Sequence, residues 1–182
     1  ILLKEFMTSK ILRGEKTLIR PVNIDDLTLL YVWENNPDNN LFTHVDLPIS
    51  IFQIQELIEN QSDVFKYNQM RFIICDLINM TPVGTIDLYN VDFQIKSAEI
   101  GILIVDPSNR RKGFAYESIE LVKDFCLNIL ALEKLYCFIN EDNHMSQSLF
   151  SKNSFIMKEK PNNVHSESLN SDVNFKYFEL CF

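Results

Sequence analysis

The chain has 182 residues, of which 46% are hydrophobic and 12% aromatic, so it can bury one substantial core, and we expect one domain over residues 1–182. Its formal net charge of −8 argues against nucleic acid as the main partner and favours a cationic substrate. No apolar run approaches the roughly 18 to 20 residues that span a bilayer, and charges interrupt the opening segment, unlike a secretory signal. These features predict a cytoplasmic protein with no membrane partner.

The cysteines and histidines predict neither a disulfide framework nor a metal site. The cysteines lie in apolar surroundings at wide spacings, which is typical of buried free thiols in a reducing compartment. The histidines lie in polar loops and are too scattered to form a ligand set or a catalytic triad. These residues are Cys75, Cys126, Cys137 and Cys181, and His44, His144 and His165.

The first part of the chain predicts a strand followed by two helices. Residues 17–22 have the composition of a strand, and residues 23–26 supply a helix start before an apolar run. Ser50 caps a second helix, in which apolar residues recur at helical spacing. The segment between the helices, residues 34–47, is polar and too long for a tight turn, and loops of this length often carry binding function.

The middle of the chain predicts a hairpin and then a central strand. Residues 71–75 and 83–89 have strand composition and flank a turn at residues 79–82. A second turn over residues 90–96 leads to an apolar strand that runs through residues 98–105. The order to this point is one strand, two helices and three strands.

The last part of the chain predicts two more helices and further strands. Apolar residues recur at helical spacing after Gly113, and a compact apolar strand follows that helix. A short helix then precedes a brief apolar segment, and a polar loop over residues 158–172 leads to a last strand. The predicted elements are the helices 114–130 and 146–152, the strands 135–139 and 173–182, and the segment 155–157.

A cationic loop joins the central strand to the helix that follows it. Asp106 and Pro107 stop the strand, and the loop ends at Gly113. A helix N-terminus leaves N–H groups unpaired and carries a partial positive charge, so this junction favours phosphate. Gly113 lets the backbone approach a phosphate and tolerates unusual φ, while Ala115 keeps the first helical turn narrow. The alternative interpretation is a surface loop whose charges are solvated.

This loop resembles the pyrophosphate-binding signature of the GNAT acetyltransferases, Arg/Gln-x-x-Gly-x-Gly/Ala. Here the signature consists of Arg110, Arg111, Lys112, Gly113, Phe114 and Ala115. Residues 18–33 resemble the opening of the branch with ribosomal-protein alanine and spermidine acetyltransferases. Residues 140–146 and 150–155 resemble the Asn-x-x-Ser and Lys-x-Gly-Phe segments of that branch. The resemblance covers roughly residues 16–180. A Rossmann-type dinucleotide site is a poor alternative, because Gly-x-Gly-x-x-Gly is absent and the loop has only one glycine.

The resemblance implies an α+β fold of three layers, the GNAT acyl-CoA N-acyltransferase fold, with a central mixed sheet of roughly six to seven strands and about four helices. It also implies acetyl-CoA as co-substrate and direct attack by a primary amine in a ternary complex. In the family, the strand before the pyrophosphate loop splays from its neighbour, and its backbone holds the pantetheine arm and polarises the carbonyl. By position these backbone groups belong to Leu103, Ile104 and Val105.

The reaction needs a group that takes a proton from the acceptor amine. An alkyl ammonium with a pKa of about 10.4 loses its proton at pH 7 at a cost of about 4 to 5 kcal/mol, so a base or a water chain is useful. Glu99 on the central strand is the candidate base, because the family often places an acidic residue there. The alternative for Glu99 is a solvent-facing strand residue paired with a cation, and Asp87 is the next candidate.

The second matching segment supplies the remaining candidates near the thioester. Ser146 aligns with a family serine that lies near the thioester sulfur, although it could also cap the helix that follows. Asn143 is the candidate CoA ligand, and His144 could contact CoA or be an exposed loop residue. Phe150 occupies the position of a tyrosine that protonates the leaving thiolate in many relatives, and phenylalanine cannot donate a proton. Ser154 replaces the family glycine at a cost of about 1 kcal/mol if the backbone there is left-handed.

The acceptor amine is the least determined part of this interpretation. In the family it enters near residues 34–47 and 158–172, and Glu34, Asp38 and Asp46 could hold a second ammonium group of a polyamine. These residues could equally form a solvated loop. We therefore expect acetyl-CoA and a small amine or peptide amine as partners, with a slight preference for a polyamine over a peptide N-terminus or an amino sugar. The alternative function is a CoA-binding module without turnover, and self-association is left open.

Overall fold

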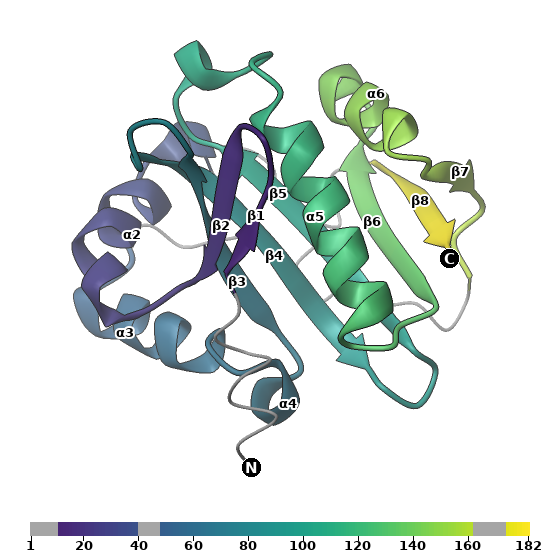
Figure 1. The fold of residues 1–182 in the computed structure, drawn as a ribbon, viewed down its shortest axis with the longest axis horizontal. Helices are drawn as coiled ribbons and strands as arrows, with labels where there is room; N and C mark the ends of the chain where they lie inside the picture. The colour runs from purple at the N-terminus through teal and green to yellow at the C-terminus, as the bar shows by residue number, and fades with distance from the viewer. Residues whose placement is uncertain (1–10, 40–47, 162–173) are drawn as a thin grey trace.

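The computed structural model describes residues 11–39, 48–161 and 174–182, which form a mixed sheet of eight strands covered by helices (Figure 1). The strand order is β1-β2-β3-β4-β5-β6-β8-β7. The strands are β1 (Leu12–Arg13), β2 (Thr17–Pro21), β3 (Met70–Asp76), β4 (Pro82–Asp92), β5 (Ser97–Ile104), β6 (Lys134–Asn140), β7 (Ile156–Lys158) and β8 (Phe175–Cys181). The helices are α2 (Leu27–Glu34), α3 (Ile51–Asn60), α4 (Val64–Tyr67), α5 (Phe114–Asn128) and α6 (His144–Lys152).

One pair of neighbouring strands in the described sheet, β5 and β6, is parallel. Strands β1 to β5 pair antiparallel with their neighbours, β5 and β6 pair parallel, and β6, β8 and β7 are again antiparallel. Parallel neighbours need a crossover connection, and α5 supplies it. Because β5 leads into α5 through the cationic loop, that loop lies at the end of the sheet where β5 finishes.

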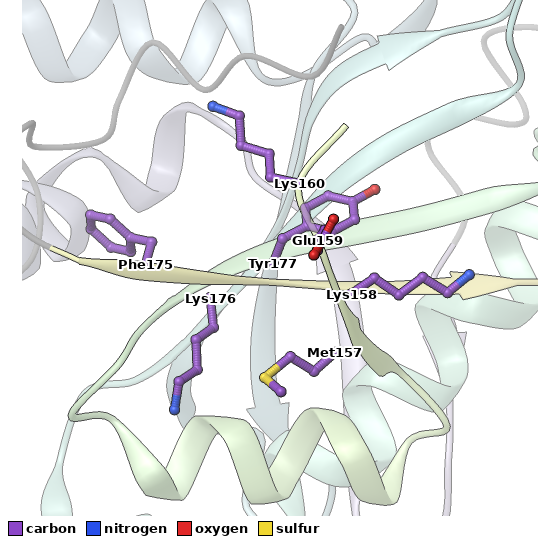
Figure 2. A pocket seen from close by; sticks show the side chains of 7 residues that line it. All are labelled: Met157, Lys158, Glu159, Lys160, Phe175, Lys176 and Tyr177. Carbon is purple, nitrogen blue, oxygen red and sulfur yellow. The ribbon is translucent and has the colours of Figure 1, made fainter. Parts of the chain in front are cut away.

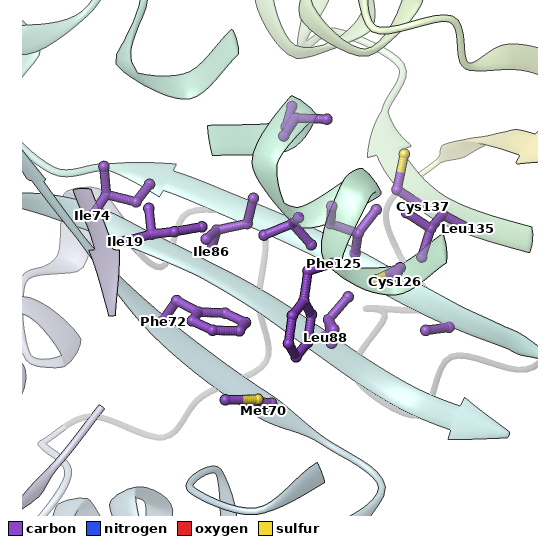
Figure 3. Close-up of a cluster of buried hydrophobic side chains, with 14 of the residues drawn as sticks. Ile19, Met70, Phe72, Ile74, Ile86, Leu88, Phe125, Cys126, Leu135 and Cys137 are labelled. Carbon is purple, nitrogen blue, oxygen red and sulfur yellow. The ribbon is translucent and has the colours of Figure 1, made fainter. Parts of the chain in front are cut away.

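Strand β3 shows how the two faces of the sheet are filled. Phe72 belongs to the larger core under α5, where its ring meets Phe125 edge to face with centroids 5.5 Å apart (Figure 3). Ile73, the next residue, belongs to a second core with Leu30 of α2 and Ile54 of α3. Successive strand residues point to opposite faces, so the sheet lies between two helical layers. The three-layer α+β architecture is thus confirmed.

The predicted order of elements is also confirmed, with differences at short elements. The sheet gains β1, and the single turn α4 raises the number of helices in the described ranges to five. Ser50 caps α3, accepting from the Gln53 N–H at 3.3 Å, as the sequence predicts. All four cysteines are free, and Cys75, Cys126 and Cys137 are buried as predicted, but Cys181 is exposed because it lies at the end of β8, next to the C-terminus. Over the described ranges, no helix is both long and apolar enough to cross a membrane.

Candidate active site

Strands β5 and β6 separate after a short stretch of pairing. They pair from Ser97 with Lys134 to Glu99 with Tyr136, whereas β5 continues to Ile104 and keeps its pairing with β4 to that residue. The opening between the two strands beyond Glu99 is called the strand wedge below. This is the splay that the family resemblance implies for the pantetheine arm.

The alternation of backbone groups decides which residues of β5 face the strand wedge. Val105 donates its N–H to a β4 carbonyl at 3.1 Å, and a Cβ on Gly84 of β4 would collide with the Leu103 carbonyl oxygen. Leu103 and Val105 therefore direct their backbone groups toward β4. In an extended strand the intervening residues face the other edge, so Ile102 and Ile104 present theirs to the wedge. Leu103 and Val105 thus do not face the wedge as predicted, whereas Ile104 does, together with Ile102.

The wedge leads to the start of α5, where the backbone is left-handed at two positions. Arg111 has φ 63° and Gly113 has φ 96°, and α5 begins at Phe114. The Phe114 side chain is buried in the core, so only its backbone is available to a ligand. Ala115 follows in the first turn. The unusual φ expected at Gly113 is therefore confirmed, and it favours glycine more strongly than the space around the Cα does.

The three cations of the loop are exposed, and two of them make contacts that order the loop. Arg110 donates from Nε to the Ile104 carbonyl oxygen at 3.4 Å, and Lys112 donates from Nζ to Asn109 Oδ1 at 3.0 Å. Arg111 lies between them. These side chains lie beside the start of α5, and a helix N-terminus with cations next to it favours an anion.

Glu99 lies at the closed end of the strand wedge. It is only 8% exposed and accepts a hydrogen bond from Asn90 Nδ2 to Oε2 at 3.0 Å, so the solvent-facing alternative is wrong. Since Ile100 faces the core under α5, Glu99 faces the opposite side of the sheet. The hydroxyl pKa of its neighbour Tyr136 is raised to about 12, first by burial and then by the charge of Glu99.

A buried ion-pair cluster lies on the same face as Glu99. Arg71 donates from Nε to Asp87 Oδ1 at 2.7 Å and from Nη2 to Oδ2 at 3.2 Å, and it forms a salt bridge with Glu34 from α2. Tyr89 donates its hydroxyl to Asp87 Oδ2 at 2.8 Å. Burial opposes the charge of Arg71, but Asp87, Tyr89 and Glu34 outweigh it, so the Arg71 pKa is raised.

The cluster changes two of the predicted roles. Asp87 accepts hydrogen bonds from both Arg71 and Tyr89, so Glu99 is the better candidate base of the two. Glu34 does not offer a free carboxylate to a second ammonium, because it is paired with Arg71. In the sequence, the signal for this cluster is Arg71 within a mostly apolar strand, because a buried cation needs carboxylate partners.

The remaining carboxylates predicted to hold the acceptor are Asp38 and Asp46. Asp38 is exposed in a short turn, Pro37–Asn39, in which its N–H donates to Asn36 Oδ1 at 3.1 Å. Asp46 lies outside the described residues, as do residues 162–172 of the second predicted acceptor segment.

Asn143 is the N-cap of α6. Its Oδ1 accepts from the Ser146 N–H at 3.1 Å, so the alternative in which Ser146 caps the helix is wrong, and α6 begins at His144. The Asn143 amide nitrogen is left as the group that could donate to CoA. Phe150 packs into the core edge to face with Phe155, with ring centroids 5.1 Å apart.

An open cavity of about 430 Å³ lies over β7 and β8 (Figure 2). Its lining carries three lysines, of which Lys158 is paired with Glu179 at 2.6 Å and Lys176 reaches toward α6. Glu99 is not among the lining residues, and the ring of Tyr136 lies 5.9 Å, centroid to centroid, from that of the lining residue Tyr177. It is lined by Met157, Lys158, Glu159, Lys160, Phe175, Lys176 and Tyr177.

Comparison with known proteins assigns the family. Residues 16–156 match the model described as an acetyltransferase (GNAT) domain. The chain belongs to the GNAT acetyltransferase family. The match covers the strand wedge, the Gly113 loop and α6, which carry the motifs of the resemblance. The predicted class, an acetyl-CoA-dependent N-acetyltransferase, is confirmed.

Individual relatives are distant. Acetyltransferase PseH of Campylobacter jejuni is 24% identical over 137 residues, or 74% of this chain and 79% of that protein. Spermidine N(1)-acetyltransferase of Vibrio cholerae is 25% identical over 139 residues, or 76% and 78%. The crystal structure of the Vibrio cholerae enzyme with CoA and spermine has a TM-score of 0.77 at 21% identity and covers 92% of this chain and 96% of that chain. A dodecameric structure of that enzyme has a TM-score of 0.70 at 21% identity, covering 92% and 95%.

Proposed function

We propose that this GNAT protein transfers the acetyl group of acetyl-CoA to a primary amine of a small molecule, by direct attack in a ternary complex. The observation that carries the proposal is the strand wedge, which has a buried carboxylate, Glu99, at its closed end and the Gly113 loop at its open end. A thioester in the wedge would lie between a proton acceptor and an anion site. The wedge therefore supports acyl transfer rather than simple CoA storage.

The chemistry follows from the groups around the wedge. The amine nitrogen forms a bond to the thioester carbon, the carbon–sulfur bond breaks, and the proton released by the amine passes to Glu99 directly or through water. The N–H groups of Ile102 and Ile104 face the wedge and would stabilise negative charge on the carbonyl oxygen. The CoA thiolate takes a proton from Ser146, from water or from a tyrosine, because Phe150 cannot supply one.

The charge of the acceptor face supports a cationic substrate. Glu34, Asp87 and Glu99 are three carboxylates on this face, and Arg71 is the cation that pairs with two of them. The excess of negative charge would attract a protonated amine. This excess, and the spermidine acetyltransferases among the relatives, favour a polyamine over a peptide N-terminus or an amino sugar.

Thiol release from acetyl-CoA tests the proposal. The wild-type protein is assayed with spermidine, an alanine-led peptide and an amino-sugar nucleotide, and CoA binding is measured separately by calorimetry. We expect thiol release with spermidine above the rate without any amine. Acetylation of the peptide or the sugar without spermidine turnover would overturn the polyamine preference. CoA binding with no thiol release across a broad amine panel would favour the non-catalytic binding module.

We also propose that the protein self-associates. The dodecameric Vibrio cholerae structure supports this, and so do apolar side chains exposed on the outer helices, such as Phe52 of α3, which is 78% exposed. Light scattering of the purified protein tests it, and a mass equal to the 21.3 kDa chain at micromolar concentration would contradict it.

The free thiols support a cytoplasmic location, which we propose as well. Cys126 and Cys137 are buried without a disulfide, and burial raises the pKa of both, so they are unreactive. Cell fractionation with an antibody to the protein tests the location.

A further inference from the structure

Glu117, in the first turn of α5, binds the turn between β1 and β2. Its carboxylate accepts the backbone N–H groups of Glu15, Lys16 and Thr17 at 2.8, 3.0 and 2.6 Å, and the Thr17 hydroxyl at 2.6 Å. Both carboxylate oxygens are used. The two segments lie 100 residues apart in the chain, so this contact is made only in the folded protein.

Gly14 makes the contact sterically possible. A Cβ at position 14 would stand 2.5 and 2.8 Å from the two carboxylate oxygens of Glu117, which is closer than real Cβ contacts allow. The Gly14 N–H also donates to the Thr17 carbonyl oxygen at 2.8 Å and closes the turn. Any other residue at position 14 would therefore require the Glu117 carboxylate or the turn to shift, and the contact between them would be disturbed.

The bound turn places Lys16 beside the cationic loop. Lys16 Nζ approaches the Lys112 carbonyl oxygen at 3.5 Å, and it lies 3.1 Å from the position that a Cβ on Gly113 would take. The Lys16 side chain is exposed, so its ammonium group can also meet a ligand. It therefore adds a fourth cation, from a remote part of the chain, to the three in the loop.

The charge of Glu117 does not work against an anion at this place. Burial disfavours its charged form, but the Thr17 hydroxyl and the three backbone N–H groups outweigh this, so the Glu117 pKa is lowered. A carboxylate whose oxygens already accept four hydrogen bonds is locally compensated, and Lys16, whose N–H is one of the donors, places its ammonium group at the end of the loop.

We propose that Lys16 binds the phosphates of acetyl-CoA and that Glu117 is a positioning residue that holds Lys16 at the start of α5. The proposal rests on the proposed function, because it takes the Gly113 loop as the site of the CoA pyrophosphate. A lysine acts on phosphate as a compact point charge, so its effect should depend on the phosphates and not on the acyl group.

The first test compares donors with and without phosphate. We expect Lys16→Ala to weaken CoA binding about tenfold, equal to about 1.4 kcal/mol, and to raise KM for acetyl-CoA with little change in kcat. KM for S-acetylpantetheine, which has no phosphate, should not change, and Lys16→Arg should retain most of the affinity. Lys66→Ala is the control for net charge, because Lys66 is exposed on α4. Equal losses with both donors, or no loss with CoA, would overturn the role of Lys16.

The second test asks whether Glu117 acts through Lys16. Glu117→Gln should weaken CoA binding, and adding Lys16→Ala to it should cost much less than Lys16→Ala costs in the wild type. Fully additive losses would overturn the positioning role. If Glu117→Gln does not fold, Thr17→Val takes its place in the same double-mutant cycle, because it removes the hydroxyl that donates to the Glu117 carboxylate.

A third variant separates failure of this proposal from failure of the proposed function. Gly113→Val should weaken CoA binding at least tenfold, because valine cannot readily adopt a φ of 96° at the helix start. If Gly113→Val loses CoA while Lys16→Ala does not, the loop is the phosphate site and only Lys16 is misassigned. If the wild-type protein does not bind CoA, the proposed function itself fails.

Discussion

The ring of Tyr89 lies against Gly101 on the neighbouring strand, and a Cβ on Gly101 would stand 3.2 Å from Cε2 of that ring. Tyr89 reaches this position because its hydroxyl donates to Asp87, which is the cross-strand partner of Gly101. Glycine at position 101 thus leaves room for the ring. Burial raises the pKa of Tyr89, so its hydroxyl stays protonated and holds this arrangement.

Gly101→Ala should therefore disturb the acceptor face. The new methyl group displaces the Tyr89 ring, and we expect a loss of about 1 kcal/mol in the free energy of unfolding, at the low end for overpacking. The kcat should fall more than the affinity for CoA. Tyr89→Phe in the same background tests the cause, because a ring released from Asp87 can move aside and should recover part of the stability. Urea denaturation and steady-state kinetics give both quantities.

Glu99→Gln tests the proton acceptor. A general base contributes about 10²-fold, so kcat should fall by that factor while the dissociation constant of CoA stays unchanged. Glu56→Gln, an exposed carboxylate on α3, is the matched control. Turnover of Glu99→Gln at the wild-type rate would make Glu99 a structural residue.

Arg71→Met should destabilise the protein strongly. The change leaves the buried Asp87 and the half-buried Glu34 without their cation, and removal of one partner from a buried pair typically costs about 3 to 5 kcal/mol. Lys96→Met is the control, since Lys96 and Glu133 form an exposed pair that should contribute less than about 1 kcal/mol. Equal losses of unfolding free energy for the two variants in urea denaturation would show that the buried ion pairs stabilise the protein no more than the exposed pair does.

The bond between Glu117 and the β1–β2 turn should depend on pH. The Glu117 pKa is lowered in the folded protein from its ordinary value of 4.5, so its stabilising effect is present above that value and is lost as pH falls through the folded pKa. The difference in unfolding free energy between wild type and Glu117→Gln should be constant from pH 7 to about 5 and shrink below 4.5. A difference that grows on acidification would contradict this sign.

Local patterns in the sequence were enough to predict the order of the elements and the anion loop. Apolar spacing, the cap at Ser50 and the cationic residues before Gly113 are properties of neighbouring residues, and the structure retains them. Only the tertiary structure shows that β5 separates from β6 after Glu99, because pairing depends on which strands become neighbours.

Partners far apart in the chain were decided by the tertiary structure alone. The sequence contains Arg71 and Glu34, but only the strand order and the packing of α2 bring them together. In the same way, Glu117 meets the turn after Gly14 only because α5 crosses the sheet near β2. A hydrogen bond needs donor and acceptor within about 3 Å, and no spacing along the chain encodes that approach across 100 residues.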